Sequence, residues 1–255
     1  EKKTSLRQMN KKLFVHIATI CFSRTNRYAS KQQGRGMQHN LDDPSARTAV
    51  YLLPDSGKVY NKFTLELYDL VILRLSSTLV WRCPTAQLVL VYSHYLSRRH
   101  LEVGVGTGYL LQHGVFPSHS VTLLLADCST TVVRHALRRL VRYQPKAVVF
   151  DLMQADWPDL PKQQSIGINY VWHGLQGTPE QRGALLGRLA NLLTDDGVLF
   201  GATVRGIHPQ MSRLACYASR RWLAAGLFNN QYDTPEFLAD YLRRYFTEVE
   251  VWLRG

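Results

Sequence analysis

The stretch His100–Leu111, with the sequence HLEVGVGTGYLL, decides the fold of this chain. Its first residues alternate apolar side chains with Glu102, which predicts a strand, and Tyr109 begins a segment that predicts a helix. Three glycines lie between the strand and the helix: Gly104, Gly106 and Gly108. They predict a tight turn, because residues without a Cβ atom tolerate positive φ and let the backbone approach a ligand. The following helix directs unpaired N–H groups toward that turn, so the stretch predicts a nucleotide-sized pocket.

Apolar runs and helical periods alternate on both sides of this stretch. The further predicted strands are Val121–Ala126, Ala147–Leu152, Ile166–Trp172, Val198–Val204 and Val249–Leu253. The predicted helices are Lys62–Trp81, Thr85–Leu96, Thr131–Tyr143, Pro179–Leu193, Met211–Gly226 and Pro235–Tyr245. Continuous apolar runs that alternate with helices indicate a parallel sheet covered on both faces. Right-handed crossovers then predict an α/β doubly wound, mainly parallel sheet with helices on both faces.

The segment Glu102–Gly108 reads acid-x-Gly-x-Gly-x-Gly and resembles the first motif of class I (Rossmann-like) S-adenosylmethionine-dependent methyltransferases of the small-molecule type. The dinucleotide fingerprint GxGxxG matches less well, because Tyr109 stands where its third glycine packs the helix on the strand. The resemblance implies S-adenosylmethionine as the cofactor. It places the glycine loop beside the methionine part of the cofactor and Glu102 on its ammonium group.

The resemblance also implies cofactor contacts at the ends of the next two strands. Asp127 ends the second apolar run, 19 positions after Gly108, where a carboxylate can accept both ribose hydroxyls. Asp156 and Trp157 follow the third run, where the family places an acid for the adenine amino group beside a residue that stacks on the ring. Each acid has a structural alternative, which is a helix N-cap shared with Ser129 for Asp127 and a solvated loop position for Asp156.

The fourth run ends in Asn169–Leu175, NYVWHGL, which in this family faces both the cofactor and the acceptor. Asn169 is therefore expected in the cofactor site. The segment differs from the Asn-Pro-Pro-Tyr motif of enzymes that methylate base amino groups, which argues against a nucleic-acid acceptor. His173 is predicted to be catalytic, because an imidazole with an ordinary pKa of about 6.5 suits a general base toward a phenol, enol or acid. Its structural alternative is a histidine that bonds a loop and shapes the wall of the site.

Two other segments resemble parts of small-molecule members. Tyr60 and the helix that follows it, within a helical cover over about 58–97, match an N-terminal cover in which an aromatic residue closes over the cofactor. Core packing is the alternative for Tyr60. The region Pro209–Tyr232 lies where the family inserts substrate-binding structure, and its aromatic and basic residues suit a planar, even acidic, organic acceptor.

Length and composition allow one large domain, because 255 residues with 45% apolar content can bury a substantial core. The formal charge of +12 is concentrated at the start, since residues 1–40 carry nine Lys or Arg and one acid. We expect residues 1–48 to form a basic, disordered extension or leader and residues 49–255 to form the methyltransferase domain. The four cysteines have no metal-type spacing, so we predict no metal site, reduced thiols and a cytoplasmic protein, with an organelle-targeting leader as an alternative.

Together these features predict an enzyme of secondary metabolism that moves a methyl group to a small organic acceptor, preferably at oxygen and otherwise at nitrogen, sulfur or carbon. Two alternatives stay open: an RNA methyltransferase, suggested by the basic start of the chain, and a catalytically silent partner subunit. The last predicted strand, Val249–Leu253, has no antiparallel strand after it, so the fold is expected to lack the usual last strand unless another segment finishes the sheet. An unpaired edge also predicts a possible homodimer.

Overall fold

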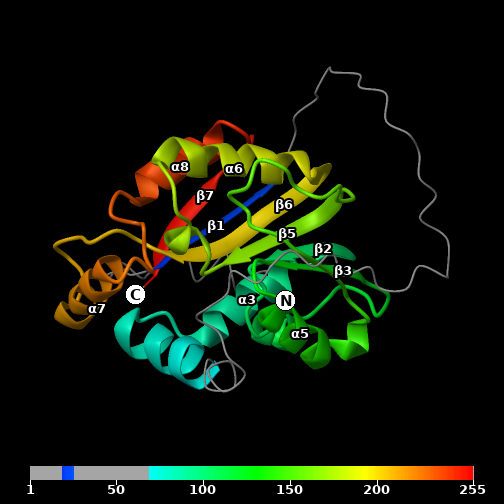
Figure 1. Ribbon diagram of the computed structural model, residues 1–255, viewed down its shortest axis with the longest axis horizontal. Coiled ribbons are helices and arrows are strands. Elements are labelled where there is room, and N and C mark those ends of the chain that lie inside the picture. The colour runs from blue at the N-terminus through cyan, green and yellow to red at the C-terminus, as the bar shows by residue number, and fades with distance from the viewer. Residues whose placement is uncertain (1–18, 26–68, 255) are drawn as a thin grey trace, which may run out of the picture.

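A computed structural model describes residues 19–25 and 69–254 of the chain. These residues build one sheet of seven strands in the order β4-β3-β2-β5-β6-β1-β7 (Figure 1). The strands are β1 (Thr19–Thr25), β2 (Arg99–Val103), β3 (Thr122–Asp127), β4 (Lys146–Val149), β5 (Gln163–Asn169), β6 (Leu193–Val204) and β7 (Glu250–Arg254). Strands β2 to β6 are parallel, which confirms the predicted doubly wound α/β fold.

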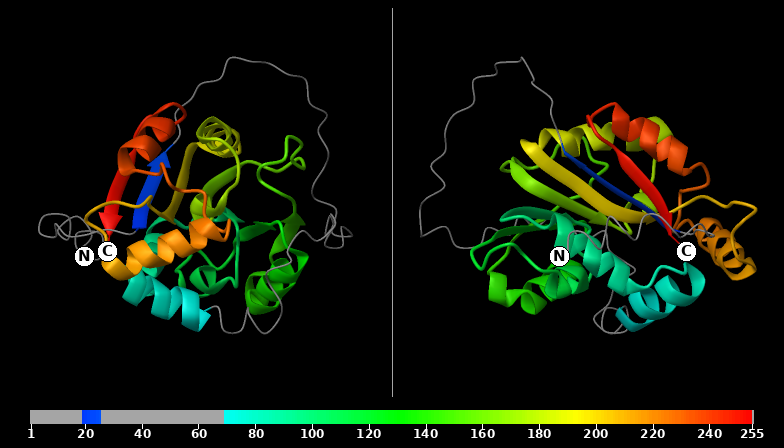
Figure 2. Two further views of the ribbon diagram at one scale, coloured as in Figure 1. Left: turned by 60° about the vertical axis from the view of Figure 1, so that its left-hand side comes forward. Right: turned by 180° about the vertical axis from the view of Figure 1, so that it is seen from behind.

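Helices cover both faces of the sheet (Figures 1 and 2). The helices are η1 (Asp69–Val80), α3 (Thr85–Tyr95), α4 (Tyr109–His113), α5 (Thr130–Arg139), α6 (Pro179–Asn191), α7 (Arg213–Ala224) and α8 (Pro235–Arg243), with short turns η2 (Val141–Tyr143) and η3 (Trp172–Gly174). Helices α6 and α8 lie on one face, and α3 and α5 lie on the other. Within the described ranges, no helix is both long enough and apolar enough to span a bilayer.

Two hydrophobic cores, one on each face, hold these layers together. Alternate residues of a strand point to opposite faces. Leu199 of β6 therefore packs with Leu186 of α6 and Leu238 of α8, whereas its neighbour Phe200 packs with Leu88 of α3. Each fully buried leucine contributes about 1.5–3 kcal/mol relative to an exposed one. This two-sided burial explains why the strands read as continuous apolar runs.

The order of the strands locates the ligand site. From β2 the chain moves outward through β3 to β4 and then returns to β5 on the other side of β2. In open α/β sheets, ligands bind beyond the carboxyl ends of the strands at such a change of direction. The glycine turn follows β2, so it lies at this point.

Another segment supplies an antiparallel strand, which is the alternative that the sequence left open. β1 lies between β6 and β7 and is antiparallel to both, with Thr19 opposite Val204 and Arg254. Thr19–Thr25, which were expected within the extension, form β1 instead, and the rest of residues 1–48 lies outside the described residues. Backbone N–H and C=O groups at a strand edge need hydrogen-bond partners. The run TICFSRT supplies these partners to β6 on one side and to β7 on the other. Association through the sheet edge stays a prediction.

Glycine 201 of β6 provides a test of the sheet packing. A Cβ atom at Gly201 would lie 1.7 Å from the carbonyl oxygen of Ile168 in β5, whereas a Cβ at Gly106 would have no neighbour within 4 Å. We expect Gly201→Ala to lower the free energy of unfolding by about 3 kcal/mol or more, because the backbone must shift. Gly106→Ala should cost only about 1–2 kcal/mol for its positive φ.

Denaturant unfolding followed by circular dichroism measures both values. Equal losses of stability in the two variants would contradict the close approach of β5 and β6 at this position.

Candidate functional site

The glycine turn has the conformation that the sequence predicts. Gly104, Gly106 and Gly108 have φ values of 67°, 53° and 76°, and the Gly104 N–H donates to the Ala126 carbonyl at 2.8 Å. A Cβ at Gly104 would lie 2.1 Å from Val171 Cγ2, so only glycine fits against the turn that follows β5. A Cβ atom at Gly106, by contrast, would have no neighbouring atom within 4 Å. The loop is therefore packed from one side and accessible from the other.

Arg139 of α5 supports the same loop, a contact that the sequence analysis missed. Its Nη1 donates to the Thr107 carbonyl at 3.1 Å, and its guanidinium lies 5.8 Å from the centre of the Tyr109 ring. The only sequence signal was the recurrence of arginines along the predicted helix.

Asp127 lies beside the glycine loop, as predicted. One carboxylate oxygen accepts the Ser129 N–H at 3.0 Å, and the carboxylate also accepts the Gly106 N–H. Burial raises the pKa of Asp127 to about 6, although these hydrogen bonds act in the opposite direction. The N-cap of α5 is Ser129, whose Oγ accepts the Val132 N–H at 3.4 Å. Ser129 therefore caps the helix, and Asp127 contributes by accepting the Ser129 N–H.

A second acid, Asp151, stands at the same edge of the sheet. Strand β4 ends at Val149, two residues before Asp151, rather than at the predicted Leu152. Burial raises the pKa of the intervening Cys128 thiol to about 11, and the negative charges of Asp127 and Asp151 add to this effect. The sequence analysis missed Asp151 because it included this acid in the apolar run.

Asp156 and Trp157 contact a different part of the fold. Asp156 is exposed, and its charge acts on Arg188 of α6. The Trp157 ring lies 3.9 Å from the Arg188 guanidinium carbon and 5.3 Å from the ring of Phe150, and its Nε1–H donates to the Leu152 carbonyl. Through these contacts, Trp157 links the loop after β4 to α6.

Glu102 is buried beneath the glycine loop, with both carboxylate oxygens already bonded. The Tyr92 hydroxyl donates to Oε1, and His100 Nε2 lies 3.0 Å from Oε2. His100 Nδ1 lies 2.8 Å from the Ser165 hydroxyl. Burial and the charge of Glu102 raise the pKa of Tyr92 well above its usual value. Glu102 thus links β2 to α3 through Tyr92, and to β5 through His100 and Ser165. The sequence did not indicate this structural role.

Asn169 ends β5 and is followed by a strained turn. Its Oδ1 is buried and accepts no hydrogen bond within the described part of the chain, and Tyr170 has a φ of 55°. A buried amide oxygen without a donor is unfavourable. A ligand that brings an N–H or O–H group to this position would satisfy it.

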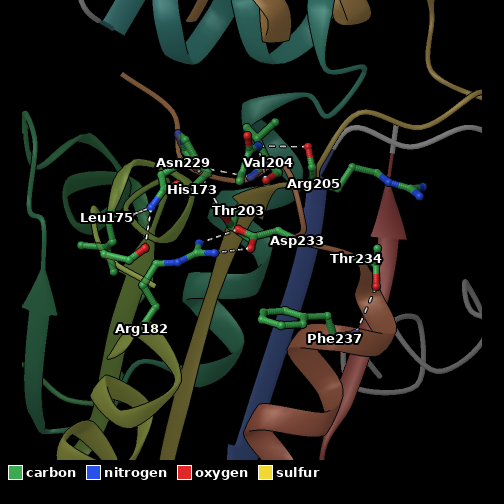
Figure 3. A network of polar contacts seen from close by, with 12 residues as sticks. His173, Leu175, Arg182, Thr203, Val204, Arg205, Asn229, Asp233, Thr234 and Phe237 are labelled. Carbon is green, nitrogen blue, oxygen red and sulfur yellow. Dashed lines mark hydrogen bonds and ion pairs between the residues drawn. The ribbon is translucent and has the colours of Figure 1, made fainter. Parts of the chain in front are cut away.

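His173 lies in η3, directly beyond this turn (Figure 3). The Val204 N–H points to its Nδ1 at 3.4 Å, and the Thr203 hydroxyl lies 3.2 Å from the same nitrogen. A backbone N–H can only donate, so Nδ1 accepts and the proton of the neutral ring is on Nε2. Burial lowers the pKa of His173 to about 3, so the premise of an ordinary pKa does not hold.

A buried polar network keeps His173 in place (Figure 3). Arg182 of α6 forms two hydrogen bonds with Asp233, at 2.9 and 3.0 Å. Nearby, the Asn229 N–H donates to the His173 carbonyl at 2.7 Å, and Asn230 Nδ2 donates to the Val204 carbonyl at 2.9 Å. The segment that leads into α8 is thereby tied to the ends of both β5 and β6.

Aromatic rings gather on the other side of His173. The rings of Trp81, Trp222 and Phe228, called here the ring cluster, lie 4.9–6.3 Å apart. The Phe228 ring lies 4.4 Å from the His173 ring, and the Tyr170 ring lies 6.1 Å from it. The region after β6 therefore places aromatic side chains beside His173. Tyr60 lies outside the described residues.

The described residues fit the cofactor that the sequence resemblance implies. Gly106 leaves room above the loop, Asn169 offers an unpaired acceptor, and Asp127 offers a carboxylate beside them. An ammonium group and ribose hydroxyls supply the matching donors.

Comparisons with known proteins agree with this geometry. A scan of protein-family models finds no match. The chain is 30% identical to demethylluteothin O-methyltransferase of Streptomyces thioluteus over 83% of this chain and 94% of that protein. It is 30% identical to the physcion biosynthesis cluster O-methyltransferase of Aspergillus chevalieri over 77% and 89%. A solved O-methyltransferase family protein from Burkholderia thailandensis shares the fold, with a TM-score of 0.51, 14% identity and coverage of 77% and 61%.

The raised pKa of Asp127 predicts how pH affects ligand binding. If Asp127 binds the ribose as predicted, the ribose hydroxyls would donate to its ionised carboxylate, and protonation below about pH 6 would compete with binding. We expect the affinity for S-adenosylhomocysteine to fall by up to about tenfold per pH unit below this value and to be constant above it. Isothermal titration between pH 5 and pH 8 measures this dependence.

Asp127→Asn is the matched control, because its amide has nearly the same shape and does not ionise. It should bind more weakly at pH 8 and lose the pH dependence. The same slope in the variant and in the parent protein would show that another group is responsible.

Proposed function

Because the chain belongs to the class I S-adenosylmethionine-dependent methyltransferases that act on small molecules, we propose that it methylates a hydroxyl oxygen of a planar organic acceptor. The observation that carries this proposal is the ring cluster beside His173, at the same edge of the sheet as the glycine loop. Flat rings pack favourably against aromatic side chains in stacked or edge-on arrangements. Both relatives described above are named O-methyltransferases, which supports oxygen as the methylated atom.

We assign the cofactor site to Gly104, Gly106, Gly108, Asp127 and Asn169. We keep Glu102 in it because each of its carboxylate oxygens can accept a second hydrogen bond. For the adenine end, the position of Asp151 directly after β4 supports this acid over Asp156 and Trp157, whose contacts are with α6. Tyr60 stays a predicted cover residue.

Bound S-adenosylmethionine supplies a methyl group on a positively charged sulfur, and transfer to a hydroxyl oxygen leaves S-adenosylhomocysteine and releases the proton of the acceptor. The protein then has to align the acceptor oxygen with the methyl group and exclude water. The ring cluster and the buried turn at Asn169 and Tyr170 suit these two tasks.

We propose a different role for His173 from the general base that the sequence suggested. Since Nδ1 is occupied and the ring stays neutral, Nε2–H can donate a hydrogen bond to the acceptor oxygen but is poorly suited to take its proton. A donor at this position favours the ionised form of the acceptor hydroxyl and orients it.

The function is tested by methyl transfer from radiolabelled S-adenosylmethionine to planar hydroxylated compounds, with alizarin, apigenin and umbelliferone as probes. We expect labelled methyl ethers of at least one probe and binding of S-adenosylhomocysteine by isothermal titration. Cofactor binding without transfer to any probe would overturn the planar-hydroxyl proposal and leave the family assignment intact.

The role of His173 is tested by a pair of variants. His173→Gln keeps an N–H donor, whereas His173→Phe removes it. We expect kcat to fall about 100-fold in His173→Phe and less than about tenfold in His173→Gln. Because the pKa of His173 is about 3, the pH profile of kcat should show no loss of activity due to this residue between pH 5 and pH 8. A loss of activity on acidification that is absent from His173→Gln would restore the general base.

A further inference from the structure

Two serine hydroxyls beside the ring cluster are buried without a partner. Ser76 of η1 is 8% exposed, Ser219 of α7 is fully buried, and neither hydroxyl makes a hydrogen bond within the described part of the chain. Native structures leave few such groups, because each unmade hydrogen bond costs about 1–3 kcal/mol. Two of them near one aromatic cluster call for a ligand.

Ser219 lies on the face of α7 that packs toward the ring cluster. Residues four and three positions apart share one face of a helix, so Ser219 lies between Ala215 and Trp222 on that face. Ala215 packs with Trp81 and Val204, and the Trp222 ring lies 5.4 Å from the Trp81 ring. Ser219 therefore lies one helical turn from the rings that we assign to the acceptor.

Ser76 approaches the same cluster from η1. Its carbonyl accepts the Trp81 N–H at 3.0 Å, which is an i to i+5 hydrogen bond of the π-helical type. Ser76 therefore lies one helical turn before Trp81, whose ring belongs to the ring cluster. The neighbouring Ser77 hydroxyl lies 3.4 Å from the Tyr170 hydroxyl, which places this part of η1 against the turn after β5. The helices η1 and α7 also pack on each other.

From this arrangement we propose that Ser76 and Ser219 form a hydrogen-bonding subsite for the acceptor. The subsite rests on the proposed function and extends it. It holds a second oxygen of a planar molecule, such as a ring carbonyl or another hydroxyl, while the reacting hydroxyl lies beside His173. The acceptor class is therefore a planar compound with at least two oxygens, and the two serines contribute to specificity.

The test measures acceptor recognition separately from folding and cofactor binding. Ser76→Ala, Ser219→Ala and the double variant are compared with the parent protein, with alizarin, apigenin and umbelliferone as oxygen-rich probes and naphthol as a planar hydroxyl compound with no second oxygen. We expect each single variant to raise KM and the Kd measured with S-adenosylhomocysteine present about tenfold for the oxygen-rich probe that is methylated. The kcat should stay within about twofold, because this contact is made equally in the ground and transition states. For naphthol, no change is expected.

Ser212→Ala is the matched control on the same helix. The Ser212 hydroxyl caps α7 by accepting the Ala215 N–H at 3.1 Å, so its loss should lower Tm without affecting KM for the acceptor. The Tm of Ser76→Ala and Ser219→Ala should stay the same or rise, because an unsatisfied hydroxyl is removed.

Three results would overturn the subsite. They are an unchanged KM and Kd in the double variant, equal effects on naphthol and on the oxygen-rich probes, and methylation of naphthol alone. If no probe is methylated although S-adenosylhomocysteine binds, the proposed function fails and the subsite fails with it. Methylation of an oxygen-rich probe that is insensitive to both serines overturns the subsite alone.

Discussion

The close packing of Gly104 against Val171 is the contact on which the site depends. It joins the loop after β2 to the turn after β5, on the two sides of the point where the strand order changes direction. A side chain at position 104 would push these two segments apart, because its Cβ would overlap a methyl group of Val171. The contact therefore sets the distance between the cofactor loop and the turn that carries Asn169 and leads to His173. Gly104 adopts its positive φ without strain, whereas Tyr170 adopts a positive φ at a cost that the surrounding structure must offset.

Buried polar groups position the segments around His173, on the side of the site that we assign to the acceptor. The ion pair of Arg182 and Asp233 is buried on both sides, and removing either partner would leave an unpaired charge in the interior. The network that includes this pair attaches the segment before α8 to the ends of β5 and β6. The Asn229 N–H holds the backbone of His173, Thr203 and the Val204 N–H contact its ring nitrogen, and the Phe228 ring packs against the imidazole. The two halves of the site are thus positioned by different means, a steric contact for the cofactor and a polar network for the acceptor.

Much of the fold and part of the site could be predicted from local patterns. The strand, turn and helix at residues 100–111, the parallel sheet and the position of Asp127 all follow from features that lie close together in the sequence, and the structure has them where expected. The errors share a cause. Asp151 was hidden in an apolar run because burial depends on where a strand ends in space. The ordinary pKa assumed for His173 does not hold because burial lowers it to about 3, and the groups that bury the ring include residues of β6 and of the segment after α7.

By itself, the sequence determined the class of fold and the glycine loop, because glycine spacing and apolar periodicity act through the local backbone. The cofactor followed from the resemblance of Glu102–Gly108 to the first motif of a known family. Only the tertiary structure decided which segment supplies the antiparallel strand, since Thr19–Thr25 pairs with strands that lie far away in the chain. It also decided that Glu102 is bonded from below, that Trp157 packs on α6, and that the unpartnered Ser76 and Ser219 both lie beside the ring cluster. These outcomes depend on the packing of elements that are distant in the sequence. The local sequence pattern does not indicate which side chains the fold brings together.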